Sequence, residues 1–196
     1  MKDVSPPHCI FNENYFNMKR PVLIYGLISG AVISAFMSIS MIVMSKDPNM
    51  EHGTSSMVIG YLAMLISFTF IFVAIKSYRD KQNNGIISFG KGFKIGLLVA
   101  LLASTIYVIT WAIVYTNFLP NFMEQYTAEM IRQAKTSMSG AALEEEIATL
   151  NKWKDMYATP WGFALFTYAE ILPVGILVSL IAALVLKRRT PKVAMA

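Results

Sequence analysis

Glu170 is the residue best placed to do chemistry, because it is the one ionisable side chain well inside an apolar run, residues 160–186. A charge at such a depth costs about 2.5–3.5 kcal/mol on insertion scales, so we expect the side chain to face the interior of a bundle or to be protonated. Three residues later, Pro173 cannot donate to the carbonyl of Ala169. A carboxyl group beside a free carbonyl can bind a proton, a cation or a polar headgroup.

Two interpretations of Glu170 stay open. In the packing interpretation, a neutral Glu170 donates a hydrogen bond to another helix and specifies how the helices pack. In the ion-handling interpretation, it takes up a proton or cation beside the aromatic stripe of Tyr107, Trp111 and Tyr115. That stripe is equally typical of a core or of an interfacial belt. The candidate polar site comprises Glu170, Pro173, Tyr107, Thr110 and Trp111, and the first-helix serines are further hydrogen-bond candidates.

Several other chemistries are disfavoured. The segment 85–91, GIISFGK, fits a phosphate-binding loop, but Gly92 stands where such a loop needs Ser or Thr for magnesium, and no strand precedes it. His8, His52 and the single Cys9 supply neither a haem pair, nor a zinc site of ordinary spacing, nor a disulfide. We therefore expect no cofactor, no metal and no enzymatic activity.

The composition is that of a membrane protein, with 55% hydrophobic and 15% charged residues among 196. Apolar runs exceed the ~20 residues that a helix needs to cross a hydrocarbon core of about 30 Å. Lipid offers the backbone no hydrogen-bond partner, so such runs must be helical. We predict an all-α integral membrane four-helix bundle, with helices at about 21–45, 53–75, 95–119 and 160–186.

The remaining segments flank these helices. In residues 120–159, Phe122 begins one i+4 apolar series and Leu143 another, which predicts a short amphipathic helical hairpin on the outer face. Polar residues 1–17 are expected to be a disordered tail, and 190–196 a second tail, around a transmembrane domain 18–189. Met18 before Lys19 and Arg20 resembles a natural amino terminus, so Met1 and Met18 are both candidate starts.

Lys and Arg are distributed unequally between the two sides of the predicted bundle. Twelve lie in the amino-terminal segment, in residues 76–94 and in the tail from Lys187, whereas five lie on the opposite side. The excess of basic residues predicts that both termini lie in the cytoplasm. Lipid headgroups explain this charge, so no nucleic-acid partner is expected, and Ile86–Phe93 is expected to lie along the interface. The candidate contacts to anionic lipid are Lys76, Arg79, Lys81, Lys91, Lys94, Lys187, Arg188 and Arg189.

Small residues recur at every fourth position on three of the predicted helices. Such ridges let helix backbones approach closely in lipid. They predict close packing inside the bundle, and a self-association face of the Gly26/Gly30 type is the alternative. The ridges are Gly26, Gly30, Ser34 and Ser38; Gly96, Ala100 and Ser104; and Gly175, Ser179 and Ala183.

The order of motifs resembles a known family. Lys76-Ser-Tyr-Arg-Asp80, then the GxISFGKxFKxG pattern from Gly85 to Gly96, then Pro173-Val-Gly175 are similar to the bacterial family catalogued as domain of unknown function 4199. The resemblance covers about Met18 to Arg189. It implies a small four-helix inner-membrane protein, and it implies neither an activity nor catalytic or ligand residues.

Three classes of function follow. The first is a structural or partner-binding membrane component, which small-residue ridges and a basic inner surface suffice to explain. The second is a small transporter, channel or accessory subunit that uses Glu170. The third, less favoured, is an enzyme that acts on lipid. The lipid bilayer is the expected surrounding, and a homo-oligomer or a membrane-protein partner both remain open.

Overall fold

A computed structural model describes residues 10–44 and 54–188 of the chain. Four long helices in it contain apolar stretches that can cross a membrane: Met18–Val43, Val58–Gln82, Phe89–Phe118 and Pro160–Leu186. This confirms the predicted all-α four-helix membrane bundle. The helices are α1 (Ile10–Met44), α2 (Thr54–Gln82), α3 (Phe89–Phe118), α4 (Phe122–Ser137), α5 (Ala141–Tyr157) and α6 (Pro160–Leu186).

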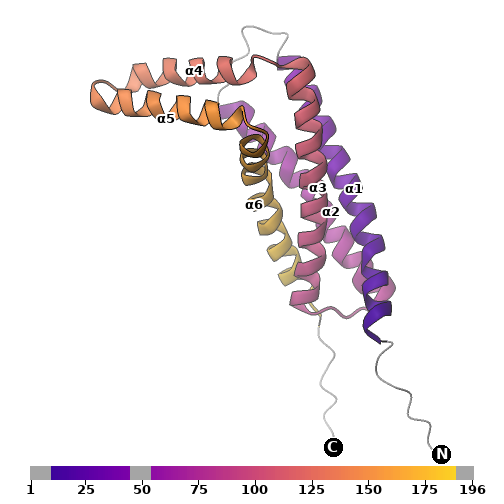
Figure 1. The fold of residues 1–196 in the computed structure, drawn as a ribbon. Coiled ribbons are helices and arrows are strands. Elements are labelled where there is room, and N and C mark those ends of the chain that lie inside the picture. The colour runs from indigo at the N-terminus through magenta and orange to yellow at the C-terminus, as the bar shows by residue number, and fades with distance from the viewer. Residues whose placement is uncertain (1–9, 45–53, 189–196) are drawn as a thin grey trace, which may run out of the picture.

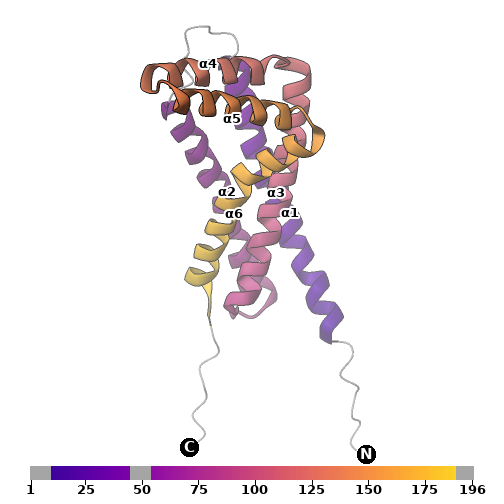
Figure 2. The same cartoon turned by 60° about the vertical axis from the view of Figure 1, so that its left-hand side comes forward.

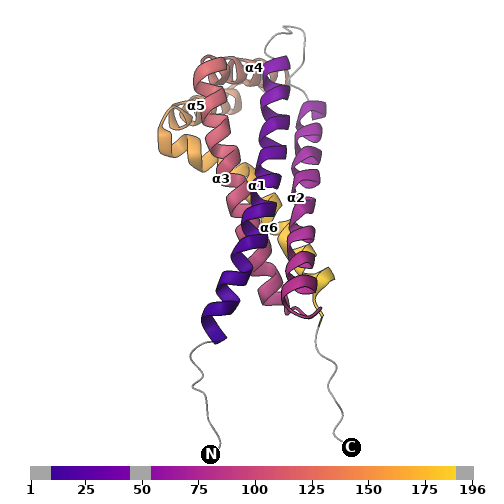
Figure 3. The same cartoon turned by 90° about the vertical axis from the view of Figure 1, so that its right-hand side faces the viewer.

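The four long helices form a closed ring. Helix α3 packs mainly against α1 and α6, and α2 packs against the same two helices from the other side (Figures 1 and 3). The start of α1, the α2–α3 connection and the end of α6 lie at one end of the bundle, which we call the terminal end (Figure 1). Helices α4 and α5 lie at the opposite end, which we call the hairpin end.

Helix boundaries differ from the predicted ones mainly beside the basic residues. Helix α2 continues to Gln82 and α3 begins at Phe89. Residues 76–82 contain neither Gly nor Pro and are mostly tolerable helix formers, so nothing stops α2 at the edge of its apolar run. The interfacial segment predicted for Ile86–Phe93 is therefore wrong, because Phe89–Phe93 belongs to the first turns of α3. Ser88 caps that helix by accepting a hydrogen bond from the Lys91 N–H at 3.4 Å.

The predicted amino-terminal tail is also shorter than expected. Helix α1 begins at Ile10, so residues 10–17 are helical. Residues 1–9 and 189–196, which hold the rest of both predicted tails, lie outside the described residues. Cys9 and His8 are among them, as is the candidate lipid contact Arg189.

Small-residue ridges bring α3 and α6 together. A Cβ atom added at Gly96 would lie 2.9 Å from the Ser179 Cβ, and one added at Gly175 would lie 2.8 Å from the Ala100 Cβ. On α1, a Cβ at Gly30 would lie 2.7 Å from a methyl group of Ile106. Real Cβ atoms do not approach so closely, so glycine is required at these contacts. The ridges pack inside the chain, as predicted.

The amphipathic hairpin is confirmed as well. Helices α4 and α5 pack against each other, and Gly140 makes the turn between them with φ 65°. The pair projects sideways from the bundle, crosswise to the long helices (Figures 1 and 2). It is joined to the bundle where α4 follows α3 and where α5 precedes α6.

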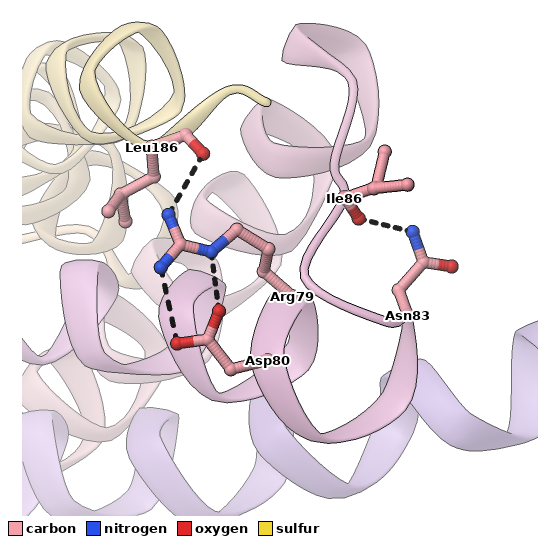
Figure 4. A network of polar contacts seen from close by, with 5 residues as sticks. All are labelled: Arg79, Asp80, Asn83, Ile86 and Leu186. Carbon is pink, nitrogen blue, oxygen red and sulfur yellow. Dashed lines mark hydrogen bonds and ion pairs between the residues drawn. The ribbon is translucent and has the colours of Figure 1, made fainter. Parts of the chain in front are cut away.

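The terminal end is held by polar contacts between α2, α6 and the α2–α3 connection. The Arg79 guanidinium pairs with Asp80 through Nε–Oδ1 and Nη2–Oδ2 distances of 2.6 and 3.2 Å, and its Nη1 donates to the Leu186 carbonyl at 3.4 Å (Figure 4). The Asn83 side-chain amide donates to the Ile86 carbonyl (Figure 4). These contacts tie the carboxyl end of α6 to the carboxyl end of α2.

A short backbone bridge completes this end. The Ile87 N–H donates to the Arg188 carbonyl at 3.0 Å, and the Arg188 N–H donates back at 2.9 Å. The chain reaches Ile87 through a turn in which Asn84 and Gly85 have φ of 50° and 77°. Gly85 suits that turn because it adopts positive φ without steric cost. The Ile87 side chain is fully buried beneath the bridge.

Candidate functional site

Glu170 lies on the outside of the bundle. It is exposed on α6, together with Leu165, Pro173, Leu177 and Ile181, and we call these five residues the exposed α6 face. Of the two expected alternatives, a Glu170 that faces the bundle interior or one that is protonated, the first is therefore wrong. The physical reason is the α3–α6 contact, which is centred on the opposite side of α6. That side buries Thr167, Ile171, Gly175, Val178, Ser179, Ala182 and Ala183.

The carboxyl group lies deep along the span. Trp161, 87% exposed at the hairpin end of α6, marks the interface that aromatic rings favour. Nine residues separate it from Glu170, which corresponds to about 13 Å at 1.5 Å per residue. Half of a 30 Å hydrocarbon core is about 15 Å. Glu170 therefore lies near the middle of a bilayer.

The proposed intramembrane site divides into two parts. Tyr107 and Trp111 are buried in the core, and Thr110 is half-buried, whereas Glu170 and Pro173 are exposed. Among the described residues, none makes a hydrogen bond with Glu170, so the bonds predicted to Tyr107 or Thr110 are not formed. The hydrogen bonds on which the packing interpretation depends are therefore absent.

Trp111 has a different partner, Tyr157 at the end of α5. The Trp111 Nε1–H donates to the Tyr157 hydroxyl at 2.6 Å. The Tyr157 ring contacts the rings of Tyr115, Phe163 and Phe166, with centroid distances of 5.7, 5.1 and 6.1 Å. We call these five residues the Tyr157 cluster. It joins α3, α5 and α6, so the aromatic stripe on α3 is core.

The role of Tyr157 was not predicted from the sequence. The sequence feature that could have indicated it is the i+4 series of Tyr107, Trp111 and Tyr115, because a buried aromatic stripe is expected to pack against aromatic side chains of another helix.

Glu170 lies beneath the Tyr157 cluster. Phe163 and Phe166 precede it by seven and four residues on α6, and these spacings place all three on one face of a helix. Burial raises the pKa of the Tyr157 phenol above its usual range, and hydrogen bonds with Trp111 and Thr167 oppose that shift without reversing it. The charge of Glu170 also raises this pKa, which agrees with its position below the ring.

The interior of the bundle offers little chemistry. Among the described residues, the buried polar groups are Ser and Thr side chains and aromatic side chains such as Tyr78 and Tyr107, and no Asp, Glu, Lys, Arg or His is buried. Two serines donate to backbone carbonyls, Ser29 to Ser67 at 2.8 Å and Ser179 to Gly175 at 2.7 Å. Within residues 10–44 and 54–188, no three His, Cys, Asp or Glu side chains are placed to hold a metal ion.

An apolar groove of about 210 Å³ runs between α1 and α2. Glu170 takes no part in it, so the groove and the carboxyl group are separate features. It is lined by Val32, Phe36, Ile59, Leu62, Ala63, Ile66 and Ser67.

Comparison with family models identifies the family to which this chain belongs. The family model described as "Protein of unknown function (DUF4199)" matches residues 24–188. The chain belongs to this family. The DUF4199 match extends over nearly all of the four spans and the whole hairpin. None of the curated proteins matches the chain significantly, and no solved structure does so.

The residues that carry the DUF4199 resemblance have structural tasks here. Arg79 and Asp80 tie α2 to α6, and Gly85 makes the turn that leads to the backbone bridge. Gly96 and Gly175 form the close contacts between α3 and α6. The motif therefore specifies how the DUF4199 bundle closes, and Glu170 lies outside that set of contacts.

Proposed function

We propose that this DUF4199 protein is a non-enzymatic, partner-binding component of a membrane, and that another membrane protein covers its exposed α6 face. The supporting observation is Glu170, an exposed carboxyl group at mid-membrane depth with apolar neighbours. Such a group in contact with lipid costs at least about 2.5–3.5 kcal/mol. A protein that covers the face and supplies a hydrogen bond removes much of that cost.

The bundle interior favours this function over ion handling. A proton or cation pathway uses a chain of ionisable or polar groups that reaches water. The described interior is instead an apolar core with scattered Ser and Thr, and Glu170 lies outside it. An enzyme acting on lipid would need polar groups that converge on the carboxyl group, and among the described residues none forms a hydrogen bond with it.

We propose a bacterial inner membrane because the family resemblance implies one, and cytoplasmic termini because of the twelve-to-five distribution of Lys and Arg. The terminal end would then face anionic lipid. Lys76, Lys81, Lys94 and Lys187 are exposed there and suit headgroup contacts.

Three other candidates for these lipid contacts are engaged within the protein. Arg79 pairs with Asp80 and Leu186, and the Lys91 Nζ lies 5.1 Å from the centroid of the Tyr78 ring. The backbone of Arg188 takes part in the bridge to Ile87, although its side chain is exposed.

Site-directed photocrosslinking in native membranes tests the proposed function. A photoreactive amino acid at Leu177 or Ile181, on the exposed α6 face, should yield an adduct heavier than the 21.9 kDa chain. Matched controls are Ile39 on α1 and Ile66 on α2, which are 64% and 65% exposed. These should yield no protein adduct. Absence of an adduct from the α6 positions, or equal adducts from all four, would overturn the proposal.

A further inference from the structure

We infer that the partner inserts a transmembrane helix carrying a Lys or Arg at mid-membrane depth, and that this helix packs along the exposed α6 face with its cation paired to Glu170. The inference rests on the proposed function and specifies the chemistry of the partner. It follows from the charge of the α6 face, from the acceptors around Glu170 and from the position of α5.

Charge complementarity comes first. Glu170 is the single ionisable group of the exposed α6 face, and the other members of that face are apolar. Ionisable side chains within membranes pair with one another or with backbone carbonyls. An opposite charge on a facing helix stabilises the ionised carboxylate, whereas a wholly apolar helix would leave it unpaired.

A second acceptor lies beside the carboxylate. Pro173 has no N–H, so the Ala169 carbonyl lacks its usual donor four residues later. Ala169 is exposed, like Glu170. A Lys ammonium has three donors and an Arg guanidinium five, so either cation can bond the carboxylate and the carbonyl together.

A second copy of the chain does not fit the same role. In the same orientation it would bring a second Glu170 to that depth, and like charges repel. The described basic side chains of the four spans all lie near the terminal end, away from mid-membrane depth. They are Lys19, Arg20, Lys76, Arg79, Lys81, Lys91 and Lys94.

The hairpin limits where the partner helix can begin. The end of α5 lies over the α6 face that carries Phe163, Phe166 and Glu170, because the Tyr157 ring contacts both phenylalanines. A helix packed on this face therefore begins below α5. Its basic residue would therefore lie within about nine residues, or roughly 13 Å, of its hairpin-end terminus. Trp153 and Met156, exposed near the end of α5, supply apolar surface at that terminus.

A defined peptide tests the inference. The probe is a polyleucine transmembrane peptide with one central Lys, acceptor-labelled and reconstituted with donor-labelled protein in phosphatidylcholine vesicles. The control peptide has Leu in place of the Lys. We expect energy transfer to report association at least about tenfold stronger for the Lys peptide, equivalent to 1.4 kcal/mol. Glu170→Gln and Glu170→Leu should abolish this preference, and the matched control Ile66→Ala should keep it.

Two readouts separate this inference from the proposed function. Melting temperatures close to that of the wild type establish that both Glu170 variants are folded. The inference would be overturned if the Lys peptide associates no better than the Leu peptide with the wild type. It would also be overturned if the Lys peptide keeps its advantage over the Leu peptide with the Glu170→Gln variant. If the α6 crosslinks persist in that case, the proposed function survives with a partner of different chemistry. A crosslinked adduct of two copies of this chain would also overturn the inference.

Discussion

At the scale of single residues, Tyr157 links the hairpin to the membrane part of the protein. Its hydroxyl accepts a hydrogen bond from Trp111, and its ring packs between Tyr115 of α3 and Phe163 of α6. Tyr157 therefore helps to fix the hairpin relative to α6, together with the contact between Phe122 of α4 and Trp111. Because Glu170 lies on the same α6 face, further from the hairpin end, the Tyr157 side chain limits access of another helix to the carboxyl group from that end.

Tyr157→Phe should lower the stability of the bundle. The ring contacts remain, but the buried Trp111 Nε1–H loses its acceptor, and an unsatisfied buried donor costs about 1–3 kcal/mol. Thermal unfolding in detergent measures the loss. The matched control is Tyr168→Phe, which removes a hydroxyl 2.9 Å from Thr105, a residue that keeps its bond to the Leu101 carbonyl. Equal melting temperatures for Tyr157→Phe and the wild type would contradict the prediction.

The orientation of Glu170 was within reach of the sequence. The predicted ridge on the last helix includes Gly175, and five residues at 100° each place Glu170 about 140° away from it. The ridge and the carboxyl group could not both face the interior. The cost of a charge in lipid favours burial of the side chain, but it does not specify which face of the helix is buried. The identity of Glu170 as the intramembrane carboxyl group was evident, and its environment was not.

At the scale of elements, the antiparallel contact of α3 with α6 determines the bundle. Gly92, Gly96 and Ala100 meet Ala183, Ser179 and Gly175, so each ridge steps by four residues against the other. In lipid such a contact gains its energy from dispersion along its whole length, since no hydrophobic effect drives the helices together.

Gly175→Leu should destabilise the bundle strongly. The added side chain meets Ala100 and Phe68, whose atoms lie 2.8 and 3.0 Å from the position of a Cβ. Overpacking costs typically about 1–3 kcal/mol, and here it also separates the whole ridge. The control is Gly60→Leu on α2, where no atom lies within 4 Å of an added Cβ. Thermal unfolding should rank Gly175→Leu far below Gly60→Leu, and similar midpoints would show that the ridge is dispensable.

Element types were predictable, whereas their ends were less so. Apolar length identified the four spans, and the i+4 series identified the hairpin. The predicted second helix ends at residue 75, where the charged segment begins, whereas α2 continues to Gln82. Charge alone does not end a helix, and here Arg79 and Asp80 form an ion pair on it. Contacts such as the bridge between Ile87 and Arg188 join residues about a hundred positions apart, and no local pattern specifies them.

At the scale of the whole molecule, the start of α1, the end of α6 and the α2–α3 connection share one side of the bundle, opposite the hairpin (Figure 1). Four spans require this arrangement, but they leave open which side faces the cytoplasm. The distribution of Lys and Arg favours the terminal end.

Cysteine labelling tests this orientation. In a Cys9→Ser background, Ser139→Cys and Lys81→Cys place single thiols at exposed positions of the hairpin end and the terminal end. Neither position requires the positive φ found at Gly140 and Asn84. A membrane-impermeant maleimide on intact spheroplasts should label position 139 and spare position 81 until the membrane is opened. The reverse pattern would invert the proposed topology.

The packing of α3 against α6 also constrains how the protein is made. Helix α3 leaves the ribosome long before α6, since the hairpin is synthesised between them. Until Pro160 and the residues after it have been inserted, the ridge of Gly92, Gly96 and Ala100 lacks its partners on α6, although side chains of α2 such as Ile71 and Ile75 lie against it. The terminal-end bridge closes after α6 has been made, because Arg188 follows that helix. The bundle is therefore completed only once α6 has been inserted, and a nascent chain stopped before Pro160 would present an open glycine ridge to lipid.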